Sequence, residues 1–308
     1  SKGSAMFTAG PPLVQAALGI ATTPEQLGGA EMHTRKSGVA HNLGQTEQDC
    51  LAMARYFLSL LPSRAGDPLP VSASATGAGK RLLEDLLDII PPTLNQAYDM
   101  RAVLASVADE QTLFELQPDF GASIITAVAR IGGTPCLLLA NQPCVQAGAI
   151  TRDAADKASH FIEVANAFGF PLVSMIDNPG VMPGATAEQS AVLKAAAGMF
   201  ASQRRYRGKK IVVTLRKAFG FGSSVMGMNP WDRQCVSIAL PSVNLGGVPA
   251  IGGATAAQAS AQETAQLEQL QSGAWVPADA MAFDQVIDPR DLRNAVIDAL
   301  GIGGDCPP

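Results

Sequence analysis

Two short stretches of this sequence combine glycine with neighbours that could shape a ligand site. One is RKAFGFGSS, residues 216–224, which follows a β-branched apolar run at 211–215 that predicts a buried strand. The other is IDNPGVMPG, residues 176–184, with two Pro-Gly breaks after another predicted strand. Proline fixes φ and glycine relaxes it, so such a loop is rigid yet lets its backbone approach a ligand. Because α/β folds bind ligands where strands end, both stretches are candidate site loops, with a plain tight turn as the alternative for the second.

A glycine turn after a strand supports two kinds of chemistry. It could bind a dinucleotide, but the third glycine, Gly227, comes two positions late for the G-x-G-x-x-G fingerprint. Arg216 and Lys217 before the turn also depart from that fingerprint. The turn could instead direct backbone N–H groups at developing negative charge. A nicotinamide-dependent oxidoreductase is therefore the weaker interpretation.

Side-chain catalytic and metal signatures are missing from the sequence. There is no G-x-S-x-G elbow and no H-E-x-x-H, and ATGAGKR at 75–81 lacks the Ser or Thr that a P-loop needs. His160 lies in a run, 153–168, whose apolar residues recur at helical spacing. We expect no bound metal, and we expect reduced thiols rather than a disulfide framework. The sequence has three histidines, His33, His41 and His160, and five cysteines, Cys50, Cys136, Cys144, Cys235 and Cys306.

The elements that must position the two loops alternate between strands and helices, which indicates an α/β layered fold. The predicted strands are 124–129, 135–140, 171–176 and 211–215, and the predicted helices are 154–168, 187–204 and 254–271. Upstream, residues 5–18 predict a short strand, a Gly-Pro-Pro break and a helix. A helix at 46–61 and a connector at 62–82 follow.

Composition limits the class of protein. The 308 residues are 47% hydrophobic and 16% charged, enough for a large core in one or two domains. A net charge of −5 gives no bulk attraction to nucleic acid or an anionic membrane. No apolar run approaches the roughly 20 residues of a membrane span, and no secretory leader is visible. We expect a cytoplasmic protein that binds neither nucleic acid nor membrane.

Several segments, taken in order, resemble the carboxyltransferase (β) subunits of biotin-dependent acyl-CoA carboxylases, such as propionyl-CoA carboxylase. They are MFTAGPPLV, LGGAEMHTRKSGVA, LLDIIP, YDMRAVLASVAD, NQP, DNPGVMPG, LRKAFGFGS and the tail VIDPRDLRNAVIDAL. Each is weak alone, but their order and spacing are specific. MFTAGPPLVQAA (6–17) and VNLGGVPAIGGA (243–254) also echo each other, as two copies of one fold would.

The resemblance implies a crotonase-like α/β fold of stacked ββα units in two tandem halves. Residues 1–63 would end the N-terminal half, and 64–308 would form the C-terminal half, with 64–95 as the connecting stretch. Roughly 200 residues of the first half, the size of a large domain, would precede this chain.

The resemblance also assigns site residues. The N–H groups of Phe221 and Gly222 would form an oxyanion hole for the ureido oxygen of biotin, whose own nitrogen is the base. Further biotin contacts would be Gly220, Ser223, Asn178, Pro179 and Gly180, and the acyl-CoA contacts would be Gly10, Pro11 and Ser224. Many relatives read Gly-Gly-Ala-Tyr where this chain has 220–223, so Gly222→Ala is expected to be milder than Gly222→Pro if residue 222 has a negative φ.

The implied activity is transfer of a carboxyl group from carboxybiotin to the α carbon of an acyl-CoA, so coenzyme A enters with the substrate. No Met-Lys-Met biotinylation site occurs, so biotin would arrive on a separate chain or domain. The implied partners are a biotin carboxyl carrier, a biotin carboxylase subunit and further copies of this chain, as a dimer or a trimer of dimers. A biotin-dependent decarboxylase and a non-catalytic crotonase-like scaffold are the alternatives.

Overall fold

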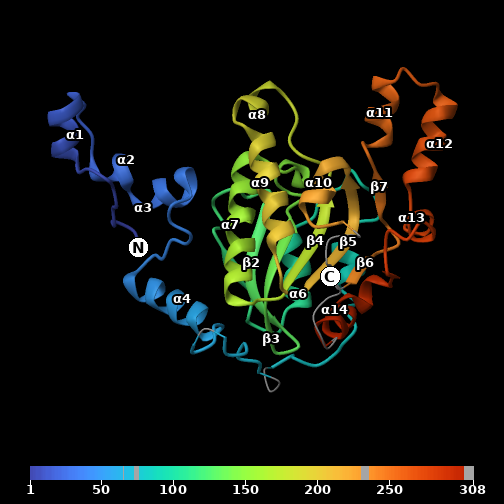
Figure 1. The fold of residues 1–308 in the computed structure, drawn as a ribbon, viewed down its shortest axis with the longest axis horizontal. Helices are drawn as coiled ribbons and strands as arrows, with labels where there is room; N and C mark the ends of the chain where they lie inside the picture. The colour runs from blue at the N-terminus through green and yellow to red at the C-terminus, as the bar shows by residue number, and fades with distance from the viewer. Residues whose placement is uncertain (65, 73–75, 230–235, 302–308) are drawn as a thin grey trace.

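The computed structural model describes residues 1–64, 66–72, 76–229 and 236–301. Within them one eight-stranded sheet forms the centre, and helices α1 to α4 extend from it as an N-terminal arm (Figure 1). The strands are β1 Phe114–Leu116, β2 Ile124–Ile131, β3 Thr134–Asn141, β4 Leu172–Asn178, β5 Lys210–Phe219, β6 Val236–Ala239, β7 Asn244–Gly246 and β8 Gln285–Val286.

Helices cover both faces of this sheet. Helices of eight or more residues are α1 Pro11–Leu18, α4 Glu47–Ser59, α6 Met100–Val107, α7 Arg152–Phe168, α9 Val192–Arg205, α12 Ala261–Gln271 and α14 Leu292–Gly301. The shorter α-helices are α2 Pro24–Gly28, α3 Ala30–Met32, α5 Leu86–Ile89, α8 Ala185–Gln189, α10 Gly220–Val225, α11 Ala250–Ala256 and α13 Trp275–Asp279. A π-helix at His33–Ser37 and 3-10 turns at Gln146–Gly148 and Pro289–Asp291 complete the set.

The strand order is β1-β2-β3-β4-β5-β6-β8, and β7 pairs with the end of β5. Strands β1 to β3 are antiparallel, whereas every pairing from β3 onward is parallel. One core packs α7 and α9 on one face, and a second packs α6 and α14 on the other. The hairpin β2–β3 followed by α7 is one ββα unit, so the predicted α/β fold is confirmed.

Strands β4 and β5 are buried along their whole length, because a parallel sheet is covered on both faces. Helix α7, which crosses between β3 and β4, is bounded by clear sequence signals. Thr151 accepts a hydrogen bond from the Ala154 N–H, and Gly169 ends the helix in the left-handed conformation at φ 73°. These signals fix where β4 starts, and hence where its carboxyl end lies.

The structure differs from the sequence prediction in three places. The strand expected within 5–18 is a single bridge between Ala5 and Gly29. The helix expected at 187–204 is interrupted at Ala191, φ 64°, and the helix expected at 254–271 is interrupted at Gln258, φ 53°. A left-handed residue cannot continue a right-handed helix, so each prediction became two helices.

The structure also bears on the expectations about cysteines, membrane spans and metal sites. Cys50, Cys136 and Cys144 are free thiols, while Cys235 and Cys306 lie outside the described residues. None of the helices described is long and apolar enough to cross a membrane. Within the same residues, no group of three or more His, Cys, Asp or Glu is placed to hold a metal ion. The division at residue 63 stays a prediction.

Candidate functional site

The two predicted loops meet at the carboxyl ends of β4 and β5. A Cβ placed on Gly222 would lie 2.4 Å from Asn178 Oδ1 and 2.5 Å from Gly180 Cα, so the backbones are in close contact. Within the first loop, the Gly180 N–H donates to Asn178 Oδ1 at 2.9 Å, and Asn178 Nδ2 donates to Asn141 Oδ1 at 3.2 Å. The structure therefore brings Asn178 to Gly180 together with the turn that starts α10.

That turn is the short helix α10, and its start requires glycine. Gly220 has φ 53°, and a Cβ there would lie 2.7 Å from the Gly247 carbonyl oxygen. The N–H groups of Phe221 and Gly222 fall in the first turn, where a helix supplies no acceptor. No described residue accepts from either of them. Two backbone donors are thus open at the end of β5.

The other residues of the turn support its shape. Ser223 Oγ donates to the Gly220 carbonyl at 2.8 Å, and the Ser224 carbonyl accepts from Asn229 Nδ2 at 2.8 Å. The Phe221 ring is partly exposed, and its centroid lies 5.9 Å from that of Phe200 on α9. Both serines therefore hold the turn, while Phe221 contributes an apolar wall beside it.

The structure adds a steric cost to one substitution in this turn. Gly222→Ala stays predicted to be milder than Gly222→Pro, but its added methyl group would collide with Asn178 and with the backbone of Gly180. A Cβ below 3.0 Å from backbone forces the two loops apart. The close approach of the loops, which no local pattern encodes, makes glycine necessary here.

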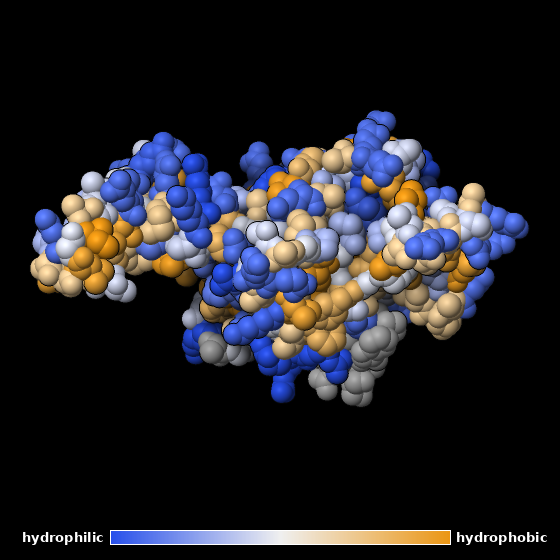
Figure 2. Space-filling model, turned by 90° about the horizontal axis from the view of Figure 1, so that it is seen from above, coloured by the Kyte–Doolittle hydropathy of each residue, from blue (hydrophilic) through white to orange (hydrophobic). Residues whose placement is uncertain are grey.

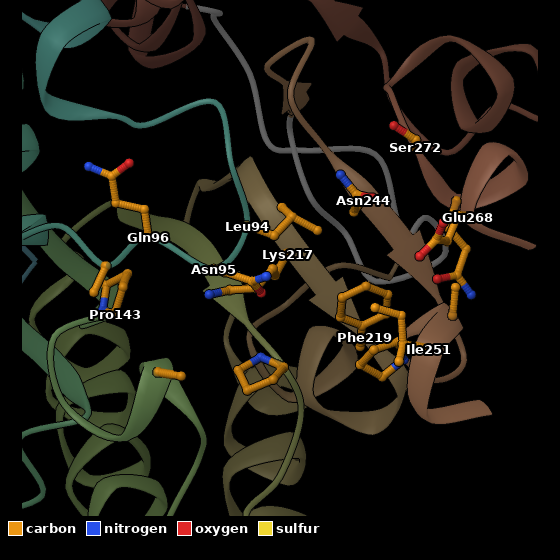
Figure 3. Close-up of a pocket in the computed structure, with 16 residues that line it drawn as sticks. Leu94, Asn95, Gln96, Pro143, Lys217, Phe219, Asn244, Ile251, Glu268 and Ser272 are labelled. Carbon is orange, nitrogen blue, oxygen red and sulfur yellow. The ribbon is translucent and has the colours of Figure 1, made fainter. Parts of the chain in front are cut away.

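A cavity of about 520 Å³ lies beside the two loops (Figure 3). Its walls come from the segment 94–97, from Pro179, Lys217 and Phe219, and from α11 and α12, which contribute Ile251 and Glu268. Of the predicted site residues, Pro179 lines this cavity, and Phe219 connects it to the turn. Sequence reasoning missed Lys217 and the segment 94–97 as parts of the site.

Lys217, which lines this cavity, belongs to a group of three buried charges with Asp177 and Arg216. Asp177 Oδ2 lies 2.8 Å from Arg216 Nε, and Asp177 Oδ1 lies 3.4 Å from Lys217 Nζ. The pairing of β4 with β5 shifts register here, between Ile176 and Asn178. Such irregularities re-aim side chains, which is how the consecutive residues Arg216 and Lys217 both reach one carboxylate. In the sequence alone, these two cations are only departures from a dinucleotide fingerprint.

Arg216 also fixes one cavity wall. Its Nη1 donates to the carbonyl oxygens of Pro91 at 3.2 Å, Thr93 at 2.7 Å and Gln96 at 3.0 Å. The guanidinium carbon lies 4.7 Å from the ring centroid of Tyr98, whose pKa is raised by burial. The segment that lines the cavity is therefore tied to β5 by a buried cation.

Gly10 and Pro11 are not brought to this site within the chain. Gly10 precedes the first turn of α1, which begins at Pro11 on the N-terminal arm, well apart from α10 in Figure 1. Ser224, the third predicted acyl-CoA contact, follows the open donors on α10. The predicted substrate residues thus divide between two separate parts of the molecule.

Comparison with known proteins covers nearly the whole chain. The carboxyl transferase domain model matches residues 1–302. The chain is 33% identical over 304 residues to methylmalonyl-CoA decarboxylase subunit alpha of Veillonella parvula, covering 97% of this chain and 59% of that subunit. It is 32% identical over 306 residues to the propionyl-CoA carboxylase beta chain of Cereibacter sphaeroides, covering 96% and 59%.

Solved structures show the same likeness. The crystal structure of transcarboxylase 12S, described as a hexamer with hydrolysed methylmalonyl-coenzyme A bound, superposes with a TM-score of 0.91 at 28% identity. The match covers 100% of this chain and 62% of that one. The fold is crotonase-like, as predicted, and the chain spans about three fifths of the length of the curated relatives it matches.

Proposed function

Because the chain belongs to the carboxyl transferase domain family, we propose that its polypeptide is the carboxyltransferase component of a biotin-dependent acyl-CoA carboxylase. Biotin, carried on a separate chain or domain, would supply the carboxyl group and the ureido nitrogen that accepts the α proton of the acyl-CoA. The α carbon gains the carboxyl group in place of that proton, so the exchange is balanced and no external oxidant is needed. What this chain contributes is positioning and stabilisation of charge.

The observation that carries the proposal is the pair of open N–H groups at the start of α10. The N–H groups of Phe221 and Gly222 would hold the ureido oxygen of biotin, on which loss of the carboxyl group would place negative charge. Fixed backbone donors stabilise such charge without reorganising, and one donor is typically worth about 10²- to 10³-fold in rate. Gly220, packed on Gly247, and Gly222, packed on Gly180, hold Phe221 and Gly222 rigidly for that purpose.

The surroundings fit a bicyclic urea. Ligand pockets of about 300 to 1,000 Å³ with mostly apolar walls and a few fixed polar groups are typical of cofactor sites. The cavity here, about 520 Å³, has apolar walls from Leu94, Pro179 and Phe219. Asn178 and Gly180 would shape the approach, with Gly220 and Ser223 holding the donors.

Acyl-CoA binding would use Gly10, Pro11 and Ser224. Since α1 and α10 lie apart within one chain, we propose that Gly10 and Pro11 of one copy serve a site of another copy. This requires a homo-oligomer, a dimer or a trimer of dimers. A biotin carboxyl carrier and a biotin carboxylase subunit would be the other partners.

The test uses the full-length polypeptide, free biotin and methylmalonyl-CoA labelled in its free carboxyl group. The expected result is label transferred to biotin, in proportion to enzyme and dependent on biotin. Absence of transfer with this and with malonyl-CoA, for a protein shown to be folded by thermal melting, would overturn the proposal. Tight binding of NAD would favour the oxidoreductase interpretation instead.

A decarboxylase is the second candidate, and one comparison favours it. The relative from Veillonella parvula is named as a methylmalonyl-CoA decarboxylase subunit, and its identity to this chain matches that of the carboxylase chains. Both directions would use the same donors, so the site does not separate them. In cell extract, net loss of the substrate carboxyl group as CO₂ without ATP would favour decarboxylation, whereas ATP-dependent fixation of bicarbonate would favour the carboxylase.

A further inference from the structure

The three charges at the ends of β4 and β5 do not cancel. Arg216 and Asp177 are fully buried and form a close pair at 2.8 Å, which leaves the Lys217 ammonium as the surplus charge. Lys217 Nζ lies 3.4 Å from Asp177 Oδ1, and its side chain is 11% exposed. No hydrogen bond joins this Nζ to any residue in the described part of the chain. An ammonium has three donors, so this one is nearly buried without adequate acceptors.

Lys217 lines the cavity described above, on the same strand as Phe219 and three residues before the turn that opens α10. Figure 3 shows it between Leu94 and Phe219, with Glu268 of α12 across the cavity. Glu268 is the one carboxylate among the described lining residues, and it forms no ion pair with Lys217. A nearly buried cation that shares its acid partner with Arg216 attracts an anionic ligand, because it is poorly screened by solvent.

Resting on the proposed function, we propose that Lys217 binds the carboxylate that is transferred, and so distinguishes carboxylated from uncarboxylated biotin. The open N–H groups of α10 would hold the ureido oxygen, and the ammonium of Lys217, on the strand that leads into that turn, would hold the negative carboxylate attached to the urea. A charge-assisted hydrogen bond of this kind is shorter and stronger than a neutral one. A carrier that had already lost its carboxyl group would lack this contact and leave readily.

A purely structural role accounts for Lys217 less well. Removing its charge leaves Asp177 paired with Arg216, and Arg216 keeps its three carbonyl acceptors. The buried network is then electrically balanced. Loss of Arg216 or Asp177 would instead strand a buried charge, which is strongly destabilising.

The direction of charge movement predicts a specific kinetic signature. The carboxylate is charged when it binds and becomes neutral CO₂ as its bond to nitrogen breaks. A cation beside it therefore stabilises the bound donor more than the transition state. Removing the ammonium should raise KM for the carboxylated donor without lowering kcat.

The experiment uses the full-length protein with Lys217→Met, which removes the charge at similar length, and Lys217→Arg, which keeps it. Lys80→Met is the matched control, since Lys80 is exposed and pairs with Asp298. Binding is measured at 4 °C for two probes, 1′-N-carboxybiotin methyl ester and the same compound with that carboxylate capped as a methyl ester. Thermal melting checks each fold, and label transfer gives KM and kcat.

We expect the wild type, Lys80→Met and Lys217→Arg to prefer the charged probe by about tenfold or more. Lys217→Met should lose this preference, bind the capped probe unchanged, and show a raised KM with kcat not reduced. Equal affinity of the wild type for both probes would overturn the inference, even if Lys217→Met did not fold. So would a Lys217→Met variant that keeps the preference, or one that weakens both probes equally. Wild-type transfer to free biotin in the same preparation would leave the proposed function standing in each of these cases.

Discussion

At the residue scale, the N–H group of Phe221 can be removed with little other change. Phe221 already carries a Cβ, and it occupies the first turn of α10, where proline is tolerated. Phe221→Pro should lower carboxyl transfer by about 10²-fold or more, because one backbone donor is lost. Phe221→Ala, which keeps the donor and loses the ring, is the matched control and should retain most activity. Equal turnover of the two variants, both folded by thermal melting, would place the oxyanion site elsewhere.

Gly222 gives a second prediction, on stability. Gly222→Ala should lower the free energy of unfolding by about 1 to 3 kcal/mol, since an overpacked site must shift its neighbours. Gly198→Ala, in the middle of α9, is the control, because a Cβ there meets nothing within 4 Å. That change should raise the unfolding free energy by about 0.4 to 1 kcal/mol. Urea denaturation measures both, and a neutral Gly222→Ala would contradict the close contact with Gly180.

Lys157 on α7 predicts a pH dependence. Burial lowers the pKa of its ammonium to about 7, and Nζ donates to the Gln117 carbonyl at 3.3 Å. Between pH 7 and 10 the unfolded chain holds a proton that the folded protein does not, so this residue makes stability rise with pH. The difference in unfolding free energy between wild type and Lys157→Met should change by about 1.4 kcal/mol for each pH unit in that window. A difference independent of pH would show that Lys157 stays charged when folded.

Sequence alone identified the residues of the two loops but not what each one touches. Asn178, Gly180, Gly220 and Gly222 were predicted from glycine and proline spacing together with the resemblance, and the structure does bring them together. Lys217 was missed because its importance depends on Asp177 and Arg216 sharing one bulged register between two strands. Such a charge balance arises from tertiary contacts, which no single stretch of sequence displays.

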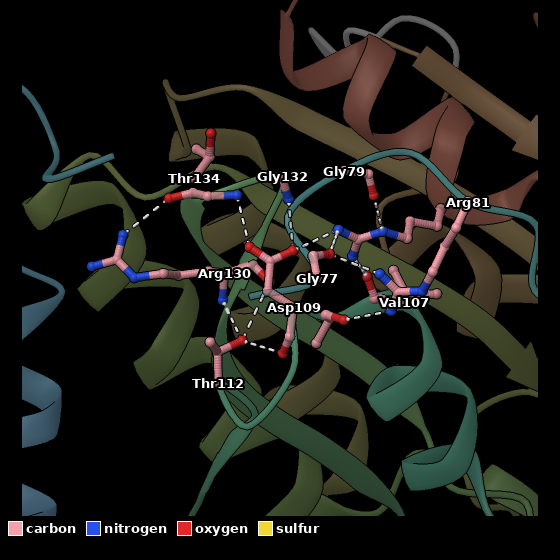
Figure 4. Close-up of polar contacts among 12 residues, drawn as sticks. Gly77, Gly79, Arg81, Val107, Asp109, Thr112, Arg130, Gly132 and Thr134 are labelled. Atoms are coloured by element: carbon pink, nitrogen blue, oxygen red, sulfur yellow. Dashed lines mark hydrogen bonds and ion pairs between the residues drawn. The ribbon is translucent and has the colours of Figure 1, made fainter. Parts of the chain in front are cut away.

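At the scale of elements, a buried ion pair joins α14 to the rest of the core. Arg293 Nη2 lies 2.6 Å from Asp109 Oδ1, and Asp109 also accepts from the Gly132 and Gly133 N–H groups at 3.0 and 2.7 Å (Figure 4). The pair therefore ties α14, the end of α6 and the turn between β2 and β3 together. Neither partner is exposed to solvent.

Arg293→Met should lower the free energy of unfolding by about 3 to 5 kcal/mol, because it leaves the Asp109 carboxylate buried without a cation. Arg290→Met is the control. Arg290 pairs with Asp288 just before the same helix, but on the surface, so that change should have little effect on urea denaturation. If both variants lost a similar amount of unfolding free energy, burial of the Arg293–Asp109 pair would contribute nothing to stability.

Elements were predicted well where a helix or strand is long, buried and clearly capped. β2 to β5 and α7 follow from apolar runs, Thr151 and Gly169. The breaks at Ala191 and Gln258 could not be predicted, since neither residue is a glycine or proline. Alanine and glutamine have no local preference for the left-handed backbone that these two positions adopt.

At the scale of the whole molecule, apolar side chains are exposed at both of its ends. The arm exposes Leu13, Leu18 and Leu58, and the α11–α13 region exposes Ile251, Leu270 and Trp275. Figure 2 shows hydrophobic residues on the projecting arm at the left. Large contiguous patches of exposed apolar residues commonly take part in protein–protein contacts.

We therefore expect the full-length polypeptide to sediment as a dimer or larger oligomer at micromolar concentration. Replacing Leu13 and Leu18 on α1 by serine should weaken that assembly, whereas Lys80→Met should not. Analytical ultracentrifugation measures the assembly state. A monomeric wild type would remove the reason for placing Gly10 and Pro11 of one copy at the site of another.

The hydrogen bonds from Arg216 to the segment 91–96 affect which residues of the site can change during evolution. The guanidinium donates hydrogen bonds to three main-chain carbonyl oxygens, so the backbone path of that segment does not depend on which side chains it carries. Leu94 and Asn95 face the cavity and can be exchanged while the backbone keeps its course. The wall therefore combines a fixed backbone with exchangeable side chains. Related enzymes could differ in ligand preference through these side chains while the contacts of Arg216 stay the same.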